Sequence, residues 1–573
     1  MTCELLRSIY GHEAGSAAET QLRDLMARYA ASLPRPASPR TALSLTERDA
    51  LLITYADQLR NAGEAPMQTL ADFARQHLRG VVSGIHLLPF YPWSSDDGFS
   101  VKDYVAIDPA LGDWSDVRRL GGEFDLMFDA VFNHMSAQGD WFRKFLRDDP
   151  GFHDFFVTVE GSPDLSWVVR PRALPLLTEF QTAGGPRKVW TTFSADQVDL
   201  NVRDPQVLLA LVGALLFYVE QGAKFIRLDA IAYLWKEIGT TCIHLPQTHQ
   251  IIQLLRAVLD ELAPQVMLIT ETNVPHVDNL SYFGDGTNEA QLVYNFALPP
   301  LVLHSLATGN AAKLTRWAQS LRLPSDRVTF FNFLASHDGI GINPARGILS
   351  DAEIEALVQR AQDHGGFVSY KHNSDGSKSP YELNINYFDA LSNPAADEPI
   401  ETQIQRFMCA QAIMLSLAGV PGIYFHSLFG SRGDRAGADA SGIPRRINRQ
   451  KSDRHALETE LATPSLRRSV FGLYKELLQK RRLCPAFNPS AWQEVIACDA
   501  RIFAVLRTSA DKSSCVLCLH NVSNETVSIR VQLPEQAAKL FEERRMKMAD
   551  PVEKMLRPYE AFWISSCAGD RPD

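Results

Sequence analysis

The stretch Phe225-Ile226-Arg227-Leu228-Asp229-Ala230 follows a Gly-Ala-Lys turn and places one arginine and one aspartate in an apolar run. A short run of this kind predicts a buried strand that meets a loop at its far end. Arg227 and Asp229 are two residues apart, so on a strand both side chains point to the same face. Because burying an ion pair costs desolvation energy, a purely structural salt bridge is the less economical interpretation. An aspartate held ionised beside an arginine at a strand end suits a carboxylate nucleophile.

Composition bounds the class of protein. The chain has 573 residues, of which 45% are hydrophobic and 22% charged, with a formal net charge of −10. This length allows about two to four domains, although an α/β barrel can run long as one unit. An acidic chain without a lysine-rich run argues against nucleic acid or an anionic membrane as the main partner. We find no apolar signal segment at the N-terminus and no stretch of 18 apolar residues, so we expect a cytoplasmic protein.

The eight cysteines are scattered without the spacing of a disulfide framework. In a chain this long they predict free thiols in a reducing compartment. Cys515 and Cys518 form a C-x-x-C match, but no second pair and no histidine pair accompanies it. Cysteines of a core or surface strand are therefore favoured over a zinc or redox site.

Eight short apolar runs recur along the chain, most of them separated by segments with a helical period. Repeated strand–helix units of this number predict a closed (β/α)8 barrel, the TIM barrel of the α/β class. The runs cover residues 50–55, 84–88, 124–133, 224–229, 266–271, 292–296, 328–338 and 421–426.

The spacing of these runs predicts the domain organisation. Residues 1–45 form a helical extension and a proline-rich linker at 33–39, and residues 46–485 form the barrel. The gaps after the third and seventh strands are too long for single helices. We expect inserted loop domains there, at about 136–200 and about 339–400, over the catalytic face. After about residue 490 the pattern changes to short strands joined by polar turns, which predicts a C-terminal antiparallel β domain at 486–573.

Three acids stand at strand ends: Asp229, Glu271 and Asp338. Side chains at these positions should converge at the carboxyl-terminal mouth of the barrel. A pair of carboxylates about 5 Å apart is what a retaining glycoside mechanism requires, one as nucleophile and one as general acid/base. A third can hold sugar hydroxyls. Any one of these acids alone could instead be a helix cap or a solvated loop residue.

Five motifs occur in a fixed order. Asp129-x-x-x-Asn133-His134, Arg227-x-Asp229, Glu271 and His337-Asp338 resemble the four signature regions of the α-amylase family, glycoside hydrolase family 13. Residues 197–201 resemble its fifth region. The resemblance spans roughly residues 50–480. It implies a TIM barrel with a domain after the third strand and a C-terminal β domain.

The resemblance also implies roles for individual residues. Asp229 would be the nucleophile, Glu271 the general acid/base and Asp338 a stabiliser of the transition state. Arg227, His134 and His337 would contact the sugar or orient the nucleophile. Amylases commonly continue the nucleophile motif with Lys-His, where this chain has Tyr233-Leu-Trp-Lys236. Since Asn133 alone is not a calcium site, we expect neither a metal nor a cofactor.

Other stretches resemble the sucrose phosphorylase subfamily, among them residues 96–99, 108–114, 236–240, 337–341 and 447–449. By that resemblance Asp96 and Arg449 would grip the outer hydroxyls of the donor glucose, and Phe99 would pack on its apolar face. Arg172, in the run Arg170-Pro-Arg172, and Tyr381 match positions that bind phosphate in the relatives. Guanidinium groups fit phosphate oxygens, although a surface-exposed basic loop is the alternative for both arginines. The partners implied are inorganic phosphate and a small α-glucoside.

The acceptor is less defined. Residues 94–100, 244–249 and 371–384 look most like the glucosylglycerate-cleaving branch of the subfamily. Glycerate is a small anion, so its site should carry cationic or hydroxyl donors. Sucrose, sucrose 6′-phosphate and glucosylglycerol stay open as substrates. The acceptor-site candidates are Gln247, His249, Lys371, His372 and Lys378, each of which could instead be a solvated loop residue.

Two further interpretations remain. In an ordinary α-glucosidase, water rather than phosphate would release the sugar from the enzyme. The missing Lys-His pair and the Arg-Pro-Arg loop argue against it. A non-catalytic sugar-binding protein would have lost at least one catalytic acid, and all three are present.

Overall fold

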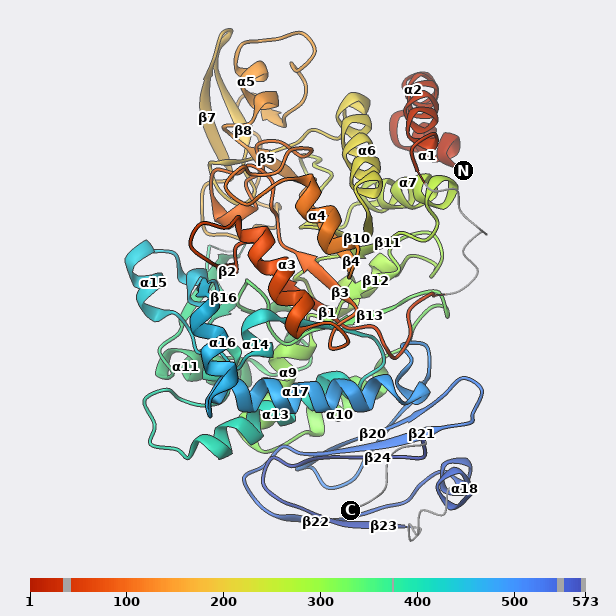
Figure 1. Ribbon diagram of the computed structural model, residues 1–573. Helices are drawn as coiled ribbons and strands as arrows, with labels where there is room; N and C mark the ends of the chain where they lie inside the picture. The colour runs from red at the N-terminus through yellow and green to blue at the C-terminus, as the bar shows by residue number, and fades with distance from the viewer. Residues whose placement is uncertain (34–42, 374–375, 544–550, 568–573) are drawn as a thin grey trace.

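The computed structural model describes residues 1–33, 43–373, 376–543 and 551–567. Eight parallel strands close into a barrel in the order in which they occur along the chain (Figure 1). The strands are β1 (Leu51–Thr54), β3 (Gly84–Leu87), β4 (Asp125–Ala130), β10 (Ala223–Leu228), β11 (Met267–Thr270), β12 (Leu292–Tyr294), β13 (Thr329–Asn332) and β17 (Val420–Tyr424). Each coincides with one of the eight apolar runs, so the predicted (β/α)8 fold is confirmed.

Helices cover the outside of the barrel. They include α3 (Pro66–His77), α4 (Trp114–Gly121), α6 (Pro205–Glu220), α7 (Pro246–Leu262), α8 (His276–Leu280), α9 (Leu298–Thr308), α10 (Ala312–Ser320), α13 (Ile400–Ser416) and α17 (Leu466–Arg482). Several of these helices, including α3, α6, α7 and α9, carry proline in the first turn, where its fixed φ suits a helix start and its missing N–H is not needed.

Two inserted segments follow β4 and β13, as the fold prediction expected. The first contains β5 (His134–Ser136), α5 (Asp140–Leu146), β6 (Thr158–Val159), β7 (Leu177–Thr182), β8 (Gly185–Trp190) and β9 (Gln197–Asp199). The second contains β14 (Ile340–Gly341), α11 (Asp351–Asp363), β15 (Phe367–His372), β16 (Lys378–Asn384) and α12 (Tyr387–Leu391). Both insertions leave the barrel at the carboxyl ends of their strands.

The C-terminal segment is an antiparallel β structure below the barrel in Figure 1. One sheet has the order β19 (Trp492–Ile496), β20 (Ile502–Thr508), β21 (Cys515–Asn521), β24 (Ala561–Ser565). A separate pair joins β22 (Val527–Val531) to β23 (Val552–Leu556), and α18 (Glu535–Glu543) lies between them in the chain. The sequence interpretation missed β23 and α18. The proposed domain boundaries at 45 and 485 stay predictions.

One expectation about cysteines is wrong. Cys484, after α17, is joined by a disulfide to Cys567, after β24, with their Cα atoms 5.6 Å apart. The two residues are 83 positions apart and meet only because the last strand returns to the end of α17, so no local spacing could indicate the pair. Cys515 and Cys518 are both free and buried, and they lie three apart on β21, which directs them to opposite faces.

In the part of the chain that the structure describes, no helix has the length and apolar character needed to cross a membrane.

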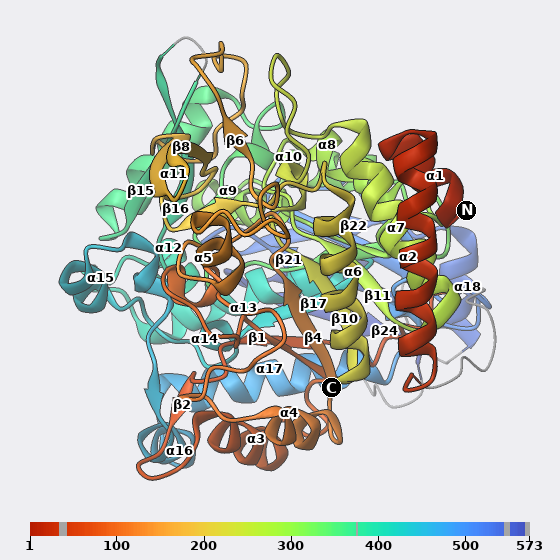
Figure 2. The same cartoon turned by 90° about the horizontal axis from the view of Figure 1, so that it is seen from above.

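The N-terminal segment forms α1 (Thr2–Tyr10) and α2 (His12–Ala30), which lie against α6 and α7 (Figure 2). Apart from Leu33, the proline-rich linker lies outside the described residues. Helix α6 is apolar around nearly its whole circumference, so its outer face needs a cover as well as its inner one. Leu22 of α2, 1% exposed, supplies part of that cover.

We predict that Leu22→Ala lowers the free energy of unfolding by about 2–4 kcal/mol, because it removes buried apolar contacts and leaves a cavity. Urea unfolding followed by circular dichroism measures the change. Asp24→Ala, at an exposed position of the same helix, is the control and should stay within about 0.5 kcal/mol of the wild type. Equal stability of the two variants would show that α2 does not contribute to the core.

Candidate active site

Arg227 is the centre of a buried charge cluster at the carboxyl end of β10. In the barrel register Arg227 lies beside Asp129 of β4, so the two side chains enter the barrel next to each other and form an ion pair. The same guanidinium lies 2.8 Å from Asp229 Oδ1 and 3.9 Å from Glu271 Oε2. Asp129 is held from its other side by His86, at 2.8 Å. The structure therefore confirms that Arg227 and Asp229 share a face, and it adds two partners.

Asp229 and Glu271 face each other beyond the strand ends. Ala230, in the left-handed conformation at φ 49°, turns the chain sharply after Asp229. Its N–H donates to Glu271 Oε2 at 3.0 Å. Burial raises the pKa of both carboxyls, and the neighbouring carboxylates add to the rise, so the pair favours holding one proton. The closer approach of Arg227 favours negative charge on Asp229, whereas the Ala230 N–H favours negative charge on Glu271.

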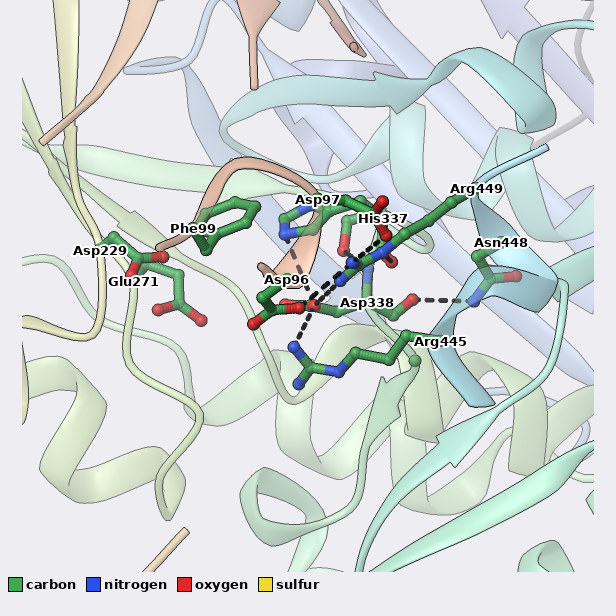
Figure 3. Close-up of polar contacts among 12 residues, drawn as sticks. Asp96, Asp97, Phe99, Asp229, Glu271, His337, Asp338, Arg445, Asn448 and Arg449 are labelled. Atoms are coloured by element: carbon green, nitrogen blue, oxygen red, sulfur yellow. Dashed lines mark hydrogen bonds and ion pairs between the residues drawn. The ribbon is translucent and has the colours of Figure 1, made fainter. Parts of the chain in front are cut away.

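Asp338 is ionised by a different set of cations. Burial opposes its ionisation, but Arg445 and Arg449 outweigh burial and hold its pKa well below the usual range. Asp338 Oδ1 lies 2.7 Å from Arg445 and 3.5 Å from both Arg449 and His337. Figure 3 shows Asp338 between the two arginines, with Asp229 and Glu271 beside each other farther along the cavity.

The loop before β4 brings an aromatic ring and two further acids to the site. Phe99 stacks on His337 with ring centroids 4.6 Å apart and an interplanar angle of 5°. Burial lowers the pKa of His337 to about 3, so this imidazole is neutral. Arg449 lies 3.2 Å from Asp96 and 2.9 Å from Asp97. An aromatic ring can pack on the apolar C–H face of a sugar, and nearby carboxylates can accept hydrogen bonds from its hydroxyls.

His134 lies in the wall of the same cavity. Its Nε2 is 3.0 Å from the Phe99 carbonyl oxygen and 3.2 Å from Gln197 Nε2, and burial lowers its pKa. His134 is therefore a neutral ring that joins the first insertion to the loop carrying Phe99. The cavity is lined by Asp96, Phe99, His134, Arg172, Phe193, Gln197, Asp229, Ala230, Ala232, Tyr233, Glu271, Thr272, Asn273, Phe296, His337, Asp338, Gly339, Tyr381, Glu382 and Arg445.

The predicted phosphate and acceptor residues separate into two groups. Arg172 and Tyr381 line the cavity, one from each insertion. The others lie outside its lining. Arg170 donates to the Leu174 carbonyl oxygen of its own loop, and His249 is engaged by Glu289 at 2.9 Å.

Gln247 is the second residue of α7, the helix that carries His249, whereas Lys371 and His372 lie on β15. None of the three lines the cavity.

Sequence reasoning missed Arg445 and Glu382. Arg445 lies within hydrogen-bond distance of both Glu382 carboxylate oxygens, at 2.9 and 2.5 Å, in addition to Asp338. The run Pro444-Arg-Arg-Ile-Asn-Arg449 offered a signal, since Arg445 lies one helical turn before a residue already selected. Glu382 had no signal beyond its adjacency to Tyr381.

The ammonium group of Lys236 lies between two side-chain oxygens that could otherwise bind a metal ion. Its Nζ lies 2.6 Å from Asp199 Oδ2 and 2.6 Å from Asn133 Oδ1, and all three side chains are buried. The ammonium group therefore uses the oxygen of Asn133, the potential calcium ligand noted in the sequence. The described residues contain no group of three or more His, Cys, Asp or Glu side chains arranged to hold a metal ion.

We predict that Lys236→Met destabilises the protein by about 3–5 kcal/mol, because it leaves the buried Asp199 carboxylate without its cation. Differential scanning calorimetry of the purified variant measures the loss. Lys224→Met removes a comparable Lys–Asp pair, 2.6 Å long but about one-third exposed, and should cost about 1 kcal/mol or less. Similar melting temperatures for the two variants would contradict the role given to Lys236.

Comparisons with known proteins agree with this geometry. The α-amylase catalytic domain family matches residues 78–339. A glucosylglycerate phosphorylase of Allomeiothermus silvanus is 52% identical over 520 residues, which cover 91% of this chain and 91% of that protein. A sucrose phosphorylase of Agrobacterium vitis is 32% identical over 469 residues, covering 77% of this chain and 88% of that protein.

Among solved structures, the sucrose 6F-phosphate phosphorylase from Thermoanaerobacter thermosaccharolyticum has the same fold, with a TM-score of 0.74 and 23% identity. The match covers 86% of this chain and 97% of that chain. The identity to the two phosphorylases, over most of the chain, shows membership of the family as well as a shared fold. The chain belongs to the α-amylase family, glycoside hydrolase family 13, within its sucrose phosphorylase subfamily.

Proposed function

We propose that the protein is a retaining glycoside phosphorylase that cleaves 2-O-α-glucosylglycerate with inorganic phosphate to α-glucose 1-phosphate and D-glycerate. The observation that carries the reaction type is that Arg227 lies 2.8 Å from Asp229 and 3.9 Å from Glu271. This difference favours Asp229 as the nucleophile and Glu271 as the acid. The choice of glycerate as the acceptor rests on the relatives, because a glucosylglycerate phosphorylase is 52% identical to this chain over 91% of its length.

In the first step Asp229 attacks the anomeric carbon while Glu271 gives its proton to the departing glycerate oxygen. Arg227 favours the ionised form of Asp229, and burial, which raises the pKa of Glu271, favours its protonated form. Asp338, ionised by Arg445, stabilises positive charge on the oxocarbenium-like sugar and accepts from its hydroxyls. The product of this step is a β-glucosyl ester on Asp229.

In the second step Glu271, now ionised, accepts a proton from the incoming phosphate, whose oxygen attacks the anomeric carbon and releases Asp229. Two inversions give α-glucose 1-phosphate with retained configuration. Arg172 and Tyr381 are the proposed phosphate ligands, since both line the cavity and a guanidinium binds phosphate oxygens. Asp96 and Arg449 are proposed to hold the outer hydroxyls, and Phe99 the apolar face of the donor glucose. The roles of Arg170, Gln247, His249, Lys371 and His372 stay predictions.

Sucrose phosphorylase activity is the second candidate. The same donor site and the same nucleophile would serve it, and a curated sucrose phosphorylase is 32% identical to this chain. The lower identity and coverage of that relative favour glucosylglycerate as the first substrate to test.

The test is release of α-glucose 1-phosphate from glucosylglycerate and from sucrose, each with and without phosphate. We expect phosphate-dependent product from glucosylglycerate, and loss of at least about 10³-fold in kcat for Asp229→Asn, which keeps the shape and removes the nucleophile. Product from sucrose alone would reassign the acceptor. Free glucose released at the same rate without phosphate would overturn phosphorolysis.

Arg445 gives a prediction about pH dependence. Activity in the first step requires protonated Glu271, so the rate is lost as pH rises through the pKa of Glu271. The Arg445 cation lowers that pKa, so Arg445→Gln should move the alkaline limb of kcat/KM to higher pH. The variant should also lower kcat about tenfold or more, because Asp338 loses its closest cation. pH–rate profiles measure both effects.

Arg445→Lys keeps the charge and should leave the alkaline limb near its wild-type position. Arg435→Gln, which disrupts an exposed pair with Asp439, serves as the surface control and should change neither kcat nor the profile. An alkaline limb unmoved by Arg445→Gln would show that Arg445 does not act on the titration of Glu271.

A further inference from the structure

The loop that carries Asp96 and Phe99 has an unusual backbone. Asp96, Asp97 and Gly98 are consecutive residues with φ of 52°, 48° and 114°. Non-glycine residues adopt this left-handed region rarely, and two in succession persist only where the surroundings hold them. The strain places Asp96 in the cavity wall and directs Asp97 toward Arg446 and Arg449. The question is what holds the ends of the loop.

Asp196, the residue before β9, holds both ends. One of its carboxylate oxygens, Oδ2, accepts from the hydroxyls of Ser94 and Ser95 at 2.5 Å and of Ser100 at 2.7 Å. Ser94 and Ser95 precede the strained residues, and Ser100 follows them. A single atom of the first insertion therefore closes the loop at its base.

Backbone contacts connect the same regions. The Asp196 carbonyl oxygen accepts from the Ala137 N–H at 2.8 Å and lies 3.0 Å from Ser100 Oγ. Ser94 Oγ also lies 2.5 Å from Ser136 Oγ of β5. Two segments of the insertion thus contact the base of the loop, while Arg449 and Arg446 hold its tip from the opposite side.

We infer that Asp196 is a positioning residue of the donor-glucose site, acting through Asp96 and Phe99 by clamping their loop. The inference rests on the proposed function, because the donor site is assigned there. A carboxylate suits this task, since it has only acceptor sites and can receive several hydroxyls at once. An amide in the same place would offer the three hydroxyls only an uncharged oxygen, which is a weaker acceptor than a carboxylate oxygen.

The experiment compares Asp196→Asn with the wild type in the synthetic direction, with α-glucose 1-phosphate and D-glycerate as substrates. We expect the KM for glucose 1-phosphate to rise about tenfold or more, with kcat and the KM for glycerate within about threefold. Asp164→Asn is the matched control. Asp164 lies in the same insertion and accepts from the Ser166 N–H, but it is exposed and outside the cavity.

A double-mutant cycle separates positioning from a general effect on folding. If Asp196 acts through Asp96, adding Asp196→Asn to Asp96→Asn should raise the donor KM much less than it does in the wild-type background. Ser95→Ala should raise the donor KM as well, and Ser95→Thr, which keeps the hydroxyl, should restore it.

The outcomes are distinguishable. An unchanged donor KM in Asp196→Asn, or a lower melting temperature as the only change, would overturn the positioning role and leave the proposed function standing. Full additivity in the cycle would also overturn it. A wild-type protein that consumes no glucose 1-phosphate would overturn the proposed function and the donor role of the loop with it.

Discussion

The buried guanidinium of Arg227 is the constraint on which the site depends. A cation of this kind costs several kcal/mol to bury unless anions and hydrogen bonds surround it. Asp129 supplies a fully buried partner, and the rings of Phe99 and Tyr294 lie 5.7 and 5.4 Å from the guanidinium carbon. Nη1 also lies 2.8 Å from Asp229, and Nη2 lies 3.9 Å from Glu271. Asp229, the proposed nucleophile, thus helps to balance the buried charge of Arg227, which couples the ionisation of Asp229 to the fold.

A second cluster of buried charges lies beside the cluster around Arg227. Arg445 and Arg449 are balanced by Asp338, Glu382 and the two aspartates of the strained loop. In one cavity, therefore, Asp338 is held ionised while burial and neighbouring carboxylates raise the pKa of Glu271. Within one cavity, Asp338 is thus favoured as a carboxylate and Glu271 as an acid. Lys236, outside the lining of the cavity, likewise supplies the cation that balances the buried Asp199 carboxylate.

The barrel and its insertions divide the work of construction. Strand ends provide the proposed catalytic carboxyls on a rigid frame, because backbone hydrogen bonds fix the register of the strands. The insertions and the loop of residues 94–100 provide the walls, and they contact one another through His134, Gln197 and Asp196. Residues proposed for phosphate come from both insertions, so the cavity is complete only when the two converge.

The sequence by itself determined the barrel, because each strand is buried on both faces and must appear as a short apolar run. It also determined which acids reach the mouth, since a residue that ends a barrel strand can lie nowhere else. Only the tertiary structure decided the partners. Arg445 with Glu382, Asp196 with three serines, Lys236 with Asp199 and Cys484 with Cys567 join residues from 37 to 102 positions apart. The local periodicity of a sequence indicates which side chains are buried and which way they point. Ion pairs and hydrogen bonds between distant residues depend instead on which segments the closed barrel brings together.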